Sequence, residues 1–173
     1  MPTPVPESVK DMIIEDANRV EKAQDCCEFV FSAVEMDKSA VQTLENDYAA
    51  HDIPVFSNSS ANRWTEDVPM IIPEINPHHL DILPEQRKKR GWGSGFIVVK
   101  PNCSLQSYLT PVYALIKAGF NVKKMIISTM QAVSGAGYPG VASLDIVDNV
   151  IPYIGGEEEK SEKEPLKILG DIR

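Results

Sequence analysis

The sequence predicts an α/β fold with parallel strands, and three stretches of the chain lead to that prediction. Residues 27–32 and 53–56 are short runs rich in aromatic and β-branched side chains, a composition typical of strands. Between them, an Asp N-cap and apolar side chains at helical spacing predict a helix over residues 37–50. A third β-rich run at 96–99 leads into another helical pattern at 103–118. Strands that alternate with helices favour a parallel sheet, and such sheets bind ligands at the carboxyl ends of their strands.

Composition and charge exclude several classes of function. The chain has 173 residues, enough for one domain or parts of two, and its net charge is -8. Because nucleic-acid binding needs clustered basic surface, we expect no nucleic-acid partner. No apolar run approaches the roughly 18 residues of a membrane span, so we expect no membrane partner either.

The cysteines and histidines do not form a recognisable metal motif. The chain has three cysteines, Cys26, Cys27 and Cys103. An odd number of cysteines without a Cys-x-x-Cys spacing argues against a disulfide framework or a zinc site. A reducing compartment fits this pattern, and we predict a cytoplasmic location. His78 and His79 have no acidic or cysteine partner at ligand spacing, so we interpret them as surface histidines and predict no metal site.

The remaining stretches predict shorter elements, whose boundaries come from proline, glycine and capping residues. They are a weak strand at 12–14, a short strand at 70–72 ended by Pro73, a helix from Asn76 to Lys88, a glycine-rich connector at 91–95, a β-rich run at 122–130, a short helix at 143–147 and a charged final helix that begins at Glu157 and makes its apolar contacts through Leu166 and Leu169.

The most informative position is Cys103, at the junction between the strand at 96–99 and the helix at 103–118. Pro101 ends the strand, and Asn102 or Cys103 stands where the helix begins. A thiol at a helix N-terminus lies at the positive end of the helix dipole, which favours the nucleophilic thiolate. Most free cysteines are instead small buried apolar residues. From its position alone, Cys103 is either a nucleophile for covalent catalysis or a core residue.

A second candidate is the stretch 131–140, which contains Gly135, Gly137 and Gly140. Three glycines within six residues permit unusual backbone angles and close approach to a ligand. Glycine is also the commonest sign of a tight turn, so spacing leaves both interpretations open.

Several motifs occur together in an order that points to one family. They are residues 56–63 (Phe-Ser-Asn-Ser-Ser-Ala-Asn-Arg), 67–76 (Asp-Val-Pro-Met-Ile-Ile-Pro-Glu-Ile-Asn), 101–104 (Pro-Asn-Cys-Ser), 130–137 (Met-Gln-Ala-Val-Ser-Gly-Ala-Gly), 149–154 (Asn-Val-Ile-Pro-Tyr-Ile) and 157–160 (Glu-Glu-Glu-Lys). With these motifs, the chain resembles the archaeal and fungal branch of the aspartate-semialdehyde dehydrogenases from about residue 8 onward.

The resemblance implies two parts. Residues 1–100 would be the C-terminal part of an NADP-binding, Rossmann-type domain, and residues 101–173 the first part of an α+β catalytic and dimerisation domain. Family members are about twice this length, on the order of two typical domains. Their glycine-rich nucleotide loop and their catalytic histidine have no counterpart here. We therefore expect an internal fragment with a truncated Rossmann domain and no dehydrogenase activity of its own.

The family reaction implies catalytic roles for three residues. That reaction is the reversible, NADPH-dependent conversion of aspartyl 4-phosphate into aspartate 4-semialdehyde and phosphate, a step of amino-acid biosynthesis. The resemblance implies that Cys103 attacks the substrate and forms a thioester. It further implies that Gln131 orients the acyl group and that Asn102 lines the same pocket.

The resemblance also implies the substrate contacts. Arg63 and Lys160 match residues at the substrate phosphate, and a guanidinium offers a planar fork of donors for phosphate oxygens. Glu157 matches a residue that contacts the substrate amino group. Without the resemblance, Glu157 and Lys160 would read as a surface ion pair three residues apart on a helix.

NADP is the implied cofactor. The resemblance places its contacts at two strand ends and in the glycine-rich stretch. The residues facing its ribose and nicotinamide are Ser32, Ala33, Ser57 and Asn58, and those of the loop that closes on it are Ser134, Gly135, Ala136 and Gly137.

Two other functions stay open. Malonyl-CoA reductase uses a closely similar chain and the same cysteine and hydride chemistry, but takes a thioester substrate. The chain is otherwise a non-catalytic module for folding or subunit contact. Because the family forms dimers and tetramers, we expect a homo-oligomer with a small-molecule substrate.

Overall fold

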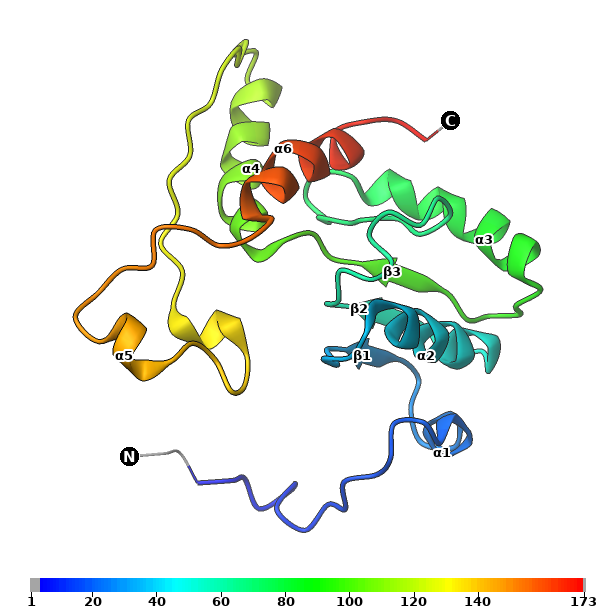
Figure 1. The fold of residues 1–173 in the computed structure, drawn as a ribbon. Coiled ribbons are helices and arrows are strands. Elements are labelled where there is room, and N and C mark those ends of the chain that lie inside the picture. Colours follow the sequence, from blue (N-terminus) through cyan, green and yellow to red (C-terminus); the bar gives the residue numbers. More distant parts are fainter. Residues whose placement is uncertain (1–3, 173) are drawn as a thin grey trace.

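The computed structural model describes residues 4–172 and shows a parallel sheet with helices packed around it (Figure 1). Both long helices predicted from the sequence, at 37–50 and 103–118, are confirmed. The α-helices are α1 (Val20–Gln24), α2 (Lys38–Ala50), α3 (Leu83–Arg90), α4 (Cys103–Lys117), α5 (Ser143–Ile146) and α6 (Glu157–Ile168); the 3₁₀ helices are η1 (Pro77–Ile82) and η2 (Val133–Ala136); the strands are β1 (Val30–Ser32), β2 (Val55–Ser57) and β3 (Ile97–Val99).

The three strands pair in the order β1-β2-β3, and both pairings are parallel. Val30 lies opposite Val55, and Val55 lies opposite Ile97. The same register places Ser32 beside Ser57, so both serines lie at the carboxyl edge of the sheet. This topology confirms the predicted α/β class.

The main apolar core joins one face of the sheet to α2, α4 and α6. It is composed of Ala49, Val55, Val68, Met70, Ile72, Ile75, Ile97, Val99, Leu105, Leu109 and Ile168. On the opposite face, Phe31 and Phe56 remain 77% and 38% exposed. The core therefore lies between the sheet and the helices that follow its strands.

Helix α2 forms where its cap and its apolar spacing predict it. The Asp37 carboxylate accepts a hydrogen bond from the backbone N–H of Ser39 at 3.0 Å, which satisfies one of the free donors at the helix start. Val41, Glu45 and Ala49 recur every fourth residue and are buried. This side of the helix packs against β2 and β3.

The predicted strand at 70–72 is reduced to a single parallel bridge between Met70 and Val99. The Ile71 N–H donates to the Val99 carbonyl at 2.9 Å, and the ladder stops there because the next two donors would come from Pro73 and Pro101, which have no N–H. The side chain of Asn76 is fully buried beside this bridge. Its Oδ1 accepts from the Ile72 N–H at 2.9 Å, and its Nδ2 donates to the Met70 carbonyl at 2.8 Å. Asn76 therefore satisfies the backbone groups of Met70 and Ile72 that face away from β3.

The prediction of two surface histidines is wrong for His79, which is 6% exposed, whereas His78 is exposed. His79 Nδ1 accepts from Asn76 Nδ2 at 3.0 Å, so its Nε2 carries the proton and donates to the Gly170 carbonyl at 2.9 Å. The imidazole thus joins η1 to the chain after α6. Within residues 4–172, no cluster of three or more metal-ligating side chains is present.

Helix α6 is buried on a different side from the one predicted. Leu166 and Leu169 are 74% and 43% exposed, while Glu164 and Ile168 are each 1% exposed. Glu164 and Ile168 lie four residues apart and share the side of the helix that faces the core. Tyr108 of α4 donates to the Ser161 carbonyl at 3.3 Å across the α4–α6 contact.

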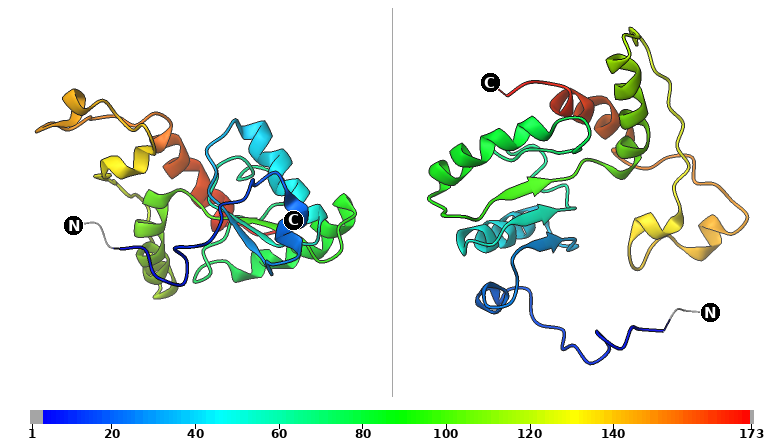
Figure 2. Two further views of the ribbon diagram at one scale, coloured as in Figure 1. Left: turned by 90° about the horizontal axis from the view of Figure 1, so that it is seen from below. Right: turned by 180° about the vertical axis from the view of Figure 1, so that it is seen from behind.

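Residues 119–155 run outside this packed body, and every one of them except Ile146 is exposed (Figure 2). The β-rich run at 122–130 forms no strand and pairs with no other segment of the described residues. Residues 12–14, predicted as a weak strand, are likewise unpaired and exposed. The short helix predicted at 143–147 is confirmed as α5.

All three cysteines are free, and the Sγ atoms of Cys26 and Cys27 lie 3.6 Å apart.

Among the helices of residues 4–172, none combines the length and the hydropathy needed to cross a lipid bilayer.

Candidate active site

Cys103 is the first residue of α4 and is exposed, whereas the residues on either side of it are buried. Asn102 is the N-cap, and its Oδ1 accepts from the Ser104 N–H at 2.8 Å. Asn102 and Ser104 are only 5% and 7% exposed, so both are held while the thiol between them is open to solvent. A solvent-accessible thiol at the start of a 15-residue helix has the position of a nucleophile.

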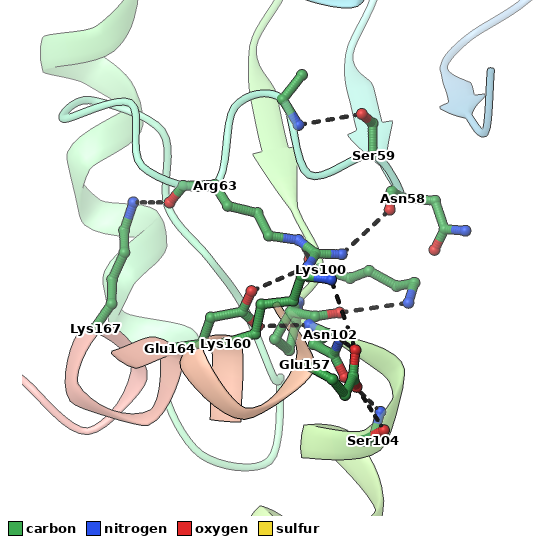
Figure 3. Close-up of polar contacts among 12 residues, drawn as sticks. Asn58, Ser59, Arg63, Lys100, Asn102, Ser104, Glu157, Lys160, Glu164 and Lys167 are labelled. Carbon is green, nitrogen blue, oxygen red and sulfur yellow. Dashed lines mark hydrogen bonds and ion pairs between the residues drawn. The ribbon is translucent and has the colours of Figure 1, made fainter. Parts of the chain in front are cut away.

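The carboxylate of Glu157 lies next to this turn and accepts hydrogen bonds from its polar side chains (Figure 3). Its Oε1 accepts from Ser104 Oγ at 2.9 Å, and its Oε2 accepts from Asn102 Nδ2 at 3.0 Å. Lys160 Nζ lies 3.6 Å from Oε2, and Gln131 Nε2 donates to Ser104 Oγ at 3.0 Å. The structure therefore brings together Asn102, Gln131, Glu157 and Lys160, which the sequence proposed as members of one site.

Glu157 is held as a carboxylate. Burial raises its pKa, but hydrogen bonds from Ser104 and Asn102 and the charge of Lys160 outweigh burial, and the net pKa is lowered from 4.5. Glu157 thus presents a fixed negative charge beside the Cys103 turn at neutral pH.

Arg63 also contacts this turn, but its guanidinium is buried and already bonded to protein groups. Its side chain is 8% exposed, and Nη1 donates to Glu164 Oε1 at 3.0 Å. Nε donates to the Lys100 carbonyl at 3.1 Å, and Nη2 donates to the Asn58 carbonyl at 3.5 Å. Glu164 accepts a second bond at 2.6 Å, from the backbone N–H of Asn102. The Arg63–Glu164 pair therefore supports the backbone of Lys100 and Asn102, just before Cys103.

Lys167 fixes the loop that carries Arg63. Its Nζ donates to the carbonyls of Arg63 at 2.7 Å, Val68 at 2.8 Å and Thr65 at 3.3 Å. Burial lowers the pKa of Lys167 to about 8. Through these bonds, α6 holds the Arg63 loop as well as the N-terminal turn of α4.

The predicted cofactor residues at the strand ends lie side by side. The Asn58 N–H donates to the Ser32 carbonyl at 2.7 Å, which ties the loops after β1 and β2 together. Ser57 Oγ donates to the buried Glu45 carboxylate at 2.5 Å. Ser32 Oγ is buried without a hydrogen-bond partner among the described residues. A buried hydroxyl without a partner is unusual, and at this edge of a parallel sheet it fits a ligand group.

The glycine-rich stretch approaches the same edge from the other side. Gly137 has a φ of 70°, and a Cβ at this position would lie 3.0 Å from Oε2 of Glu35. Glu35 follows Ala33 in the loop after β1, so the 134–137 loop lies against the loop that the sequence assigned to the cofactor. The strand ends with the unpartnered Ser32 hydroxyl and the loop at 134–137 are therefore the residues that would hold a dinucleotide at this edge.

Sequence reasoning missed three residues of this site: Lys100, Ser104 and Glu164. Ser104 links Gln131 to Glu157, and Glu164 links Arg63 to Asn102. The available signal was the spacing within α6, where Glu157, Lys160 and Glu164 recur at i, i+3 and i+7 and so share one side of the helix.

Two family models match the chain. The model described as "Semialdehyde dehydrogenase, NAD binding domain" matches residues 2–83, and the one described as "Semialdehyde dehydrogenase, dimerisation domain" matches residues 112–173. The predicted boundary after residue 100 falls between the two matches and stays a prediction.

Named relatives and a solved structure match nearly the whole chain. It is 42% identical over 172 residues to an aspartate-semialdehyde dehydrogenase of Cryptococcus neoformans, covering 99% of this chain and 47% of that protein. It is 43% identical to a malonyl CoA reductase (NADP) of Metallosphaera sedula, covering 88% and 42%. The crystal structure of an aspartate semialdehyde dehydrogenase with NADP from Candida albicans matches with a TM-score of 0.77 and 32% identity, covering 100% of this chain and 48% of that one. The chain thus spans about half the length of the curated relatives it matches.

Proposed function

Because the chain belongs to the semialdehyde dehydrogenase family, we propose that it carries the nucleophile of an NADP-dependent aspartate-semialdehyde dehydrogenase. The observation that supports this most directly is the exposed thiol of Cys103 at the start of α4, beside a charged and hydrogen-bonded carboxylate. Such a site suits acyl transfer from a substrate that carries its own positive amino group.

In the proposed reaction, Cys103 Sγ attacks the acyl carbon of aspartyl 4-phosphate as a thiolate. A C–S bond forms, the C–O bond to phosphate breaks, and phosphate leaves with that electron pair. The bound cofactor supplies the hydride that reduces the resulting thioester. The C–S bond then breaks with its electron pair returning to Sγ, which releases the semialdehyde and restores the thiolate.

The surrounding residues bind and orient this substrate. Glu157 receives the substrate ammonium, because its carboxylate is held ionised and points to the Cys103 turn. Gln131, whose amide already donates to Ser104 Oγ, orients the acyl group, and Asn102 lines the pocket floor. Lys160 contributes positive charge at the phosphate. A direct phosphate contact from Arg63 also stays a prediction. In this structure its guanidinium forms an ion pair with Glu164.

For the cofactor, we propose that NADP lies along the carboxyl edge of the sheet. The free Ser32 hydroxyl supports this position, since it lacks a hydrogen-bond partner among the described residues. The proposed cofactor residues are Ser32, Ala33, Ser57 and Asn58 at the strand ends and Ser134, Gly135, Ala136 and Gly137 in the facing loop.

Malonyl-CoA reduction is the second candidate, because a reductase of that name is 43% identical to this chain. It would use the same thiol but a CoA thioester as acyl donor. The paired Glu157 and Lys160 favour a donor with an amino group and a phosphate. The dimerisation-domain match over residues 112–173 also supports assembly into a homo-oligomer.

The test is acylation of the 173-residue chain by acetyl phosphate, a simple acyl phosphate. We expect one acetyl group on Cys103, detected by peptide mass spectrometry and removed by neutral hydroxylamine, which cleaves thioesters and spares amides. Cys27→Ser serves as the matched control and should acylate like the unmodified chain, whereas Cys103→Ser should not form the labile adduct. Preferential acylation by acetyl-CoA would favour the malonyl-CoA reductase alternative. Labelling without preference for Cys103 would contradict both functions.

A further inference from the structure

Ser104 directly follows Cys103 in the chain and joins two side chains that come from distant elements. Its Oγ donates to Glu157 Oε1 at 2.9 Å and accepts from Gln131 Nε2 at 3.0 Å. Ser104 is 7% exposed, and its backbone N–H donates to the Asn102 cap at 2.8 Å. The hydroxyl is therefore fixed in the first turn of α4, one residue after the thiol.

The direction of these hydrogen bonds is set by Glu157. Glu157 is held as a carboxylate, which only accepts hydrogen bonds, so Ser104 gives it its single hydroxyl proton. Ser104 Oγ then accepts from the Gln131 amide nitrogen. A flipped amide would set Gln131 Oε1 against an oxygen whose proton is already donated. The bonds from Gln131 through Ser104 to Glu157 therefore determine which end of the Gln131 amide faces α4.

The same hydrogen bond attaches a segment that is otherwise exposed. Gln131 belongs to residues 121–153, all of which except Ile146 are exposed. Within residues 4–172, Gln131 is the only residue of this segment that forms a hydrogen bond with the packed body. The position of the Gln131 amide therefore depends on the Ser104 hydroxyl and not on packing within its own segment.

We propose that Ser104 is a positioning residue for acyl transfer, whose hydroxyl holds the Gln131 amide with one N–H left to donate to the acyl oxygen of the substrate. This inference rests on the proposed function, in which Gln131 orients the acyl group, and it adds the residue that orients Gln131. When Cys103 Sγ attacks, the C–S bond forms and the π electrons of the carbonyl move to the acyl oxygen. The oxyanion collapses as the C–O bond to phosphate breaks. A donor that is already in place stabilises this oxyanion without reorganisation.

The test compares two reactions of the same thiol, of which only one develops an oxyanion. Acetyl phosphate acylates Cys103 through a tetrahedral oxyanion, whereas methyl iodide has no carbonyl and alkylates the thiolate by direct displacement. Both rates are measured by mass spectrometry in a Cys26→Ser/Cys27→Ser background, so that Cys103 is the only thiol. Loss of a well-placed oxyanion donor costs about 100-fold or more in rate. In Ser104→Ala the donor is present but no longer held, and we expect the ratio of acetylation to methylation to fall about tenfold.

Three further variants separate positioning from a general structural effect. Ser104→Thr keeps the hydroxyl and should retain the ratio. Ser107→Ala is the matched control, since it removes another serine hydroxyl from α4, one that donates to the Ser104 carbonyl at 2.6 Å, and it should leave the ratio unchanged. Gln131→Ala should lower the ratio, and adding Ser104→Ala to it should cause no further fall, because a positioning residue acts through its partner.

The outcomes distinguish the role of Ser104 from the proposed function. An unchanged ratio in Ser104→Ala, an equal fall of both rates, or an additive fall in the double variant would overturn the role of Ser104 and leave the proposed function intact. Absence of Cys103 acetylation in the unmodified chain, with methylation retained, would overturn the proposed function and the role of Ser104 with it. If Ser104→Ala does not fold, judged by circular dichroism, the heteronuclear NOE of the Gln131 side-chain amide in the ¹⁵N-labelled, unmodified chain decides. A rigid amide supports the role of Ser104, and a mobile amide overturns it.

Discussion

The packed body and the segment at 119–155 both contain β-rich apolar runs but have opposite structures. In the body, Val55, Ile97 and Val99 are almost completely buried in paired strands. In the segment, Ile126 and Met130 belong to an equally β-rich run, yet they are 87% and 92% exposed and unpaired. The difference shows that β-propensity specifies a strand only where a partner strand is present to complete its hydrogen bonds.

Helix α6 follows that segment but belongs to the body. Its residue Glu164 bonds to Arg63 and to the Asn102 backbone, and Ile168 lies in the core. The chain therefore leaves the body after α4 and returns to it through contacts that also support the turn before Cys103. The predictions below test whether stability and site geometry are concentrated in these contacts.

The largest effect is expected from Glu164→Gln. This change leaves the Arg63 guanidinium buried without its counter-charge, and loss of one partner of a buried ion pair costs about 3–5 kcal/mol. Urea unfolding followed by circular dichroism measures the loss. Glu162→Gln is the matched control, since Glu162 is exposed on the same helix, and its free energy of unfolding should change little. Equal effects of the two changes would show that α6 is not anchored through Glu164.

The same truncation should have very different effects in the two regions. Ile168→Ala removes a core side chain and should lower the free energy of unfolding by about 2–5 kcal/mol. Ile126→Ala removes a side chain that is 87% exposed and should change it by less than about 0.5 kcal/mol. Both are measured by urea unfolding. A large cost at Ile126 in a dilute, monomeric sample would mean that the segment packs against the body.

Acid should loosen the contact between α6 and α4. The pKa of Glu157 is lowered in the folded chain relative to 4.5, so its stabilising contribution is complete above that value and is lost as the pH falls through the lower, folded pKa. Stability should therefore decline below about pH 4.5, and Glu157→Gln should reduce this decline. Unfolding midpoints in urea at pH 6 and pH 3.5 test the sign. An identical acid dependence in the variant would exclude Glu157 as a contributor.

The smallest expected difference is in thiol reactivity. Cys103 should alkylate with iodoacetamide faster than Cys26 or Cys27, although all three are exposed. A hydrogen bond with Cys26, together with burial, raises the pKa of the Cys27 thiol and reduces its thiolate fraction. Peptide mapping after brief labelling gives the three rates, and denatured protein supplies the control in which they should converge.

The sequence by itself determined the class of fold, the family and the local structure around Cys103. The Asp37 cap, the parallel direction of the strands and a helix that begins at Asn102 or Cys103 are all present. The motif-based resemblance is likewise confirmed by the family models and the relatives. Caps and apolar spacing involve residues that are close together in the sequence, so they can be identified from the sequence alone.

Only the tertiary structure decided which side chains are free to act. Arg63 is bonded to Glu164, 101 positions away, and is withdrawn from the surface, whereas Lys100 is left without an ion pair among the described residues. The same long-range packing buries His79, exposes Leu166 and leaves residues 122–130 unpaired. Pairing of charges and strands depends on which distant groups meet. The helix that begins at Cys103 was therefore predictable from the sequence, whereas the exposure of its thiol and the pairing of the charges around it were not.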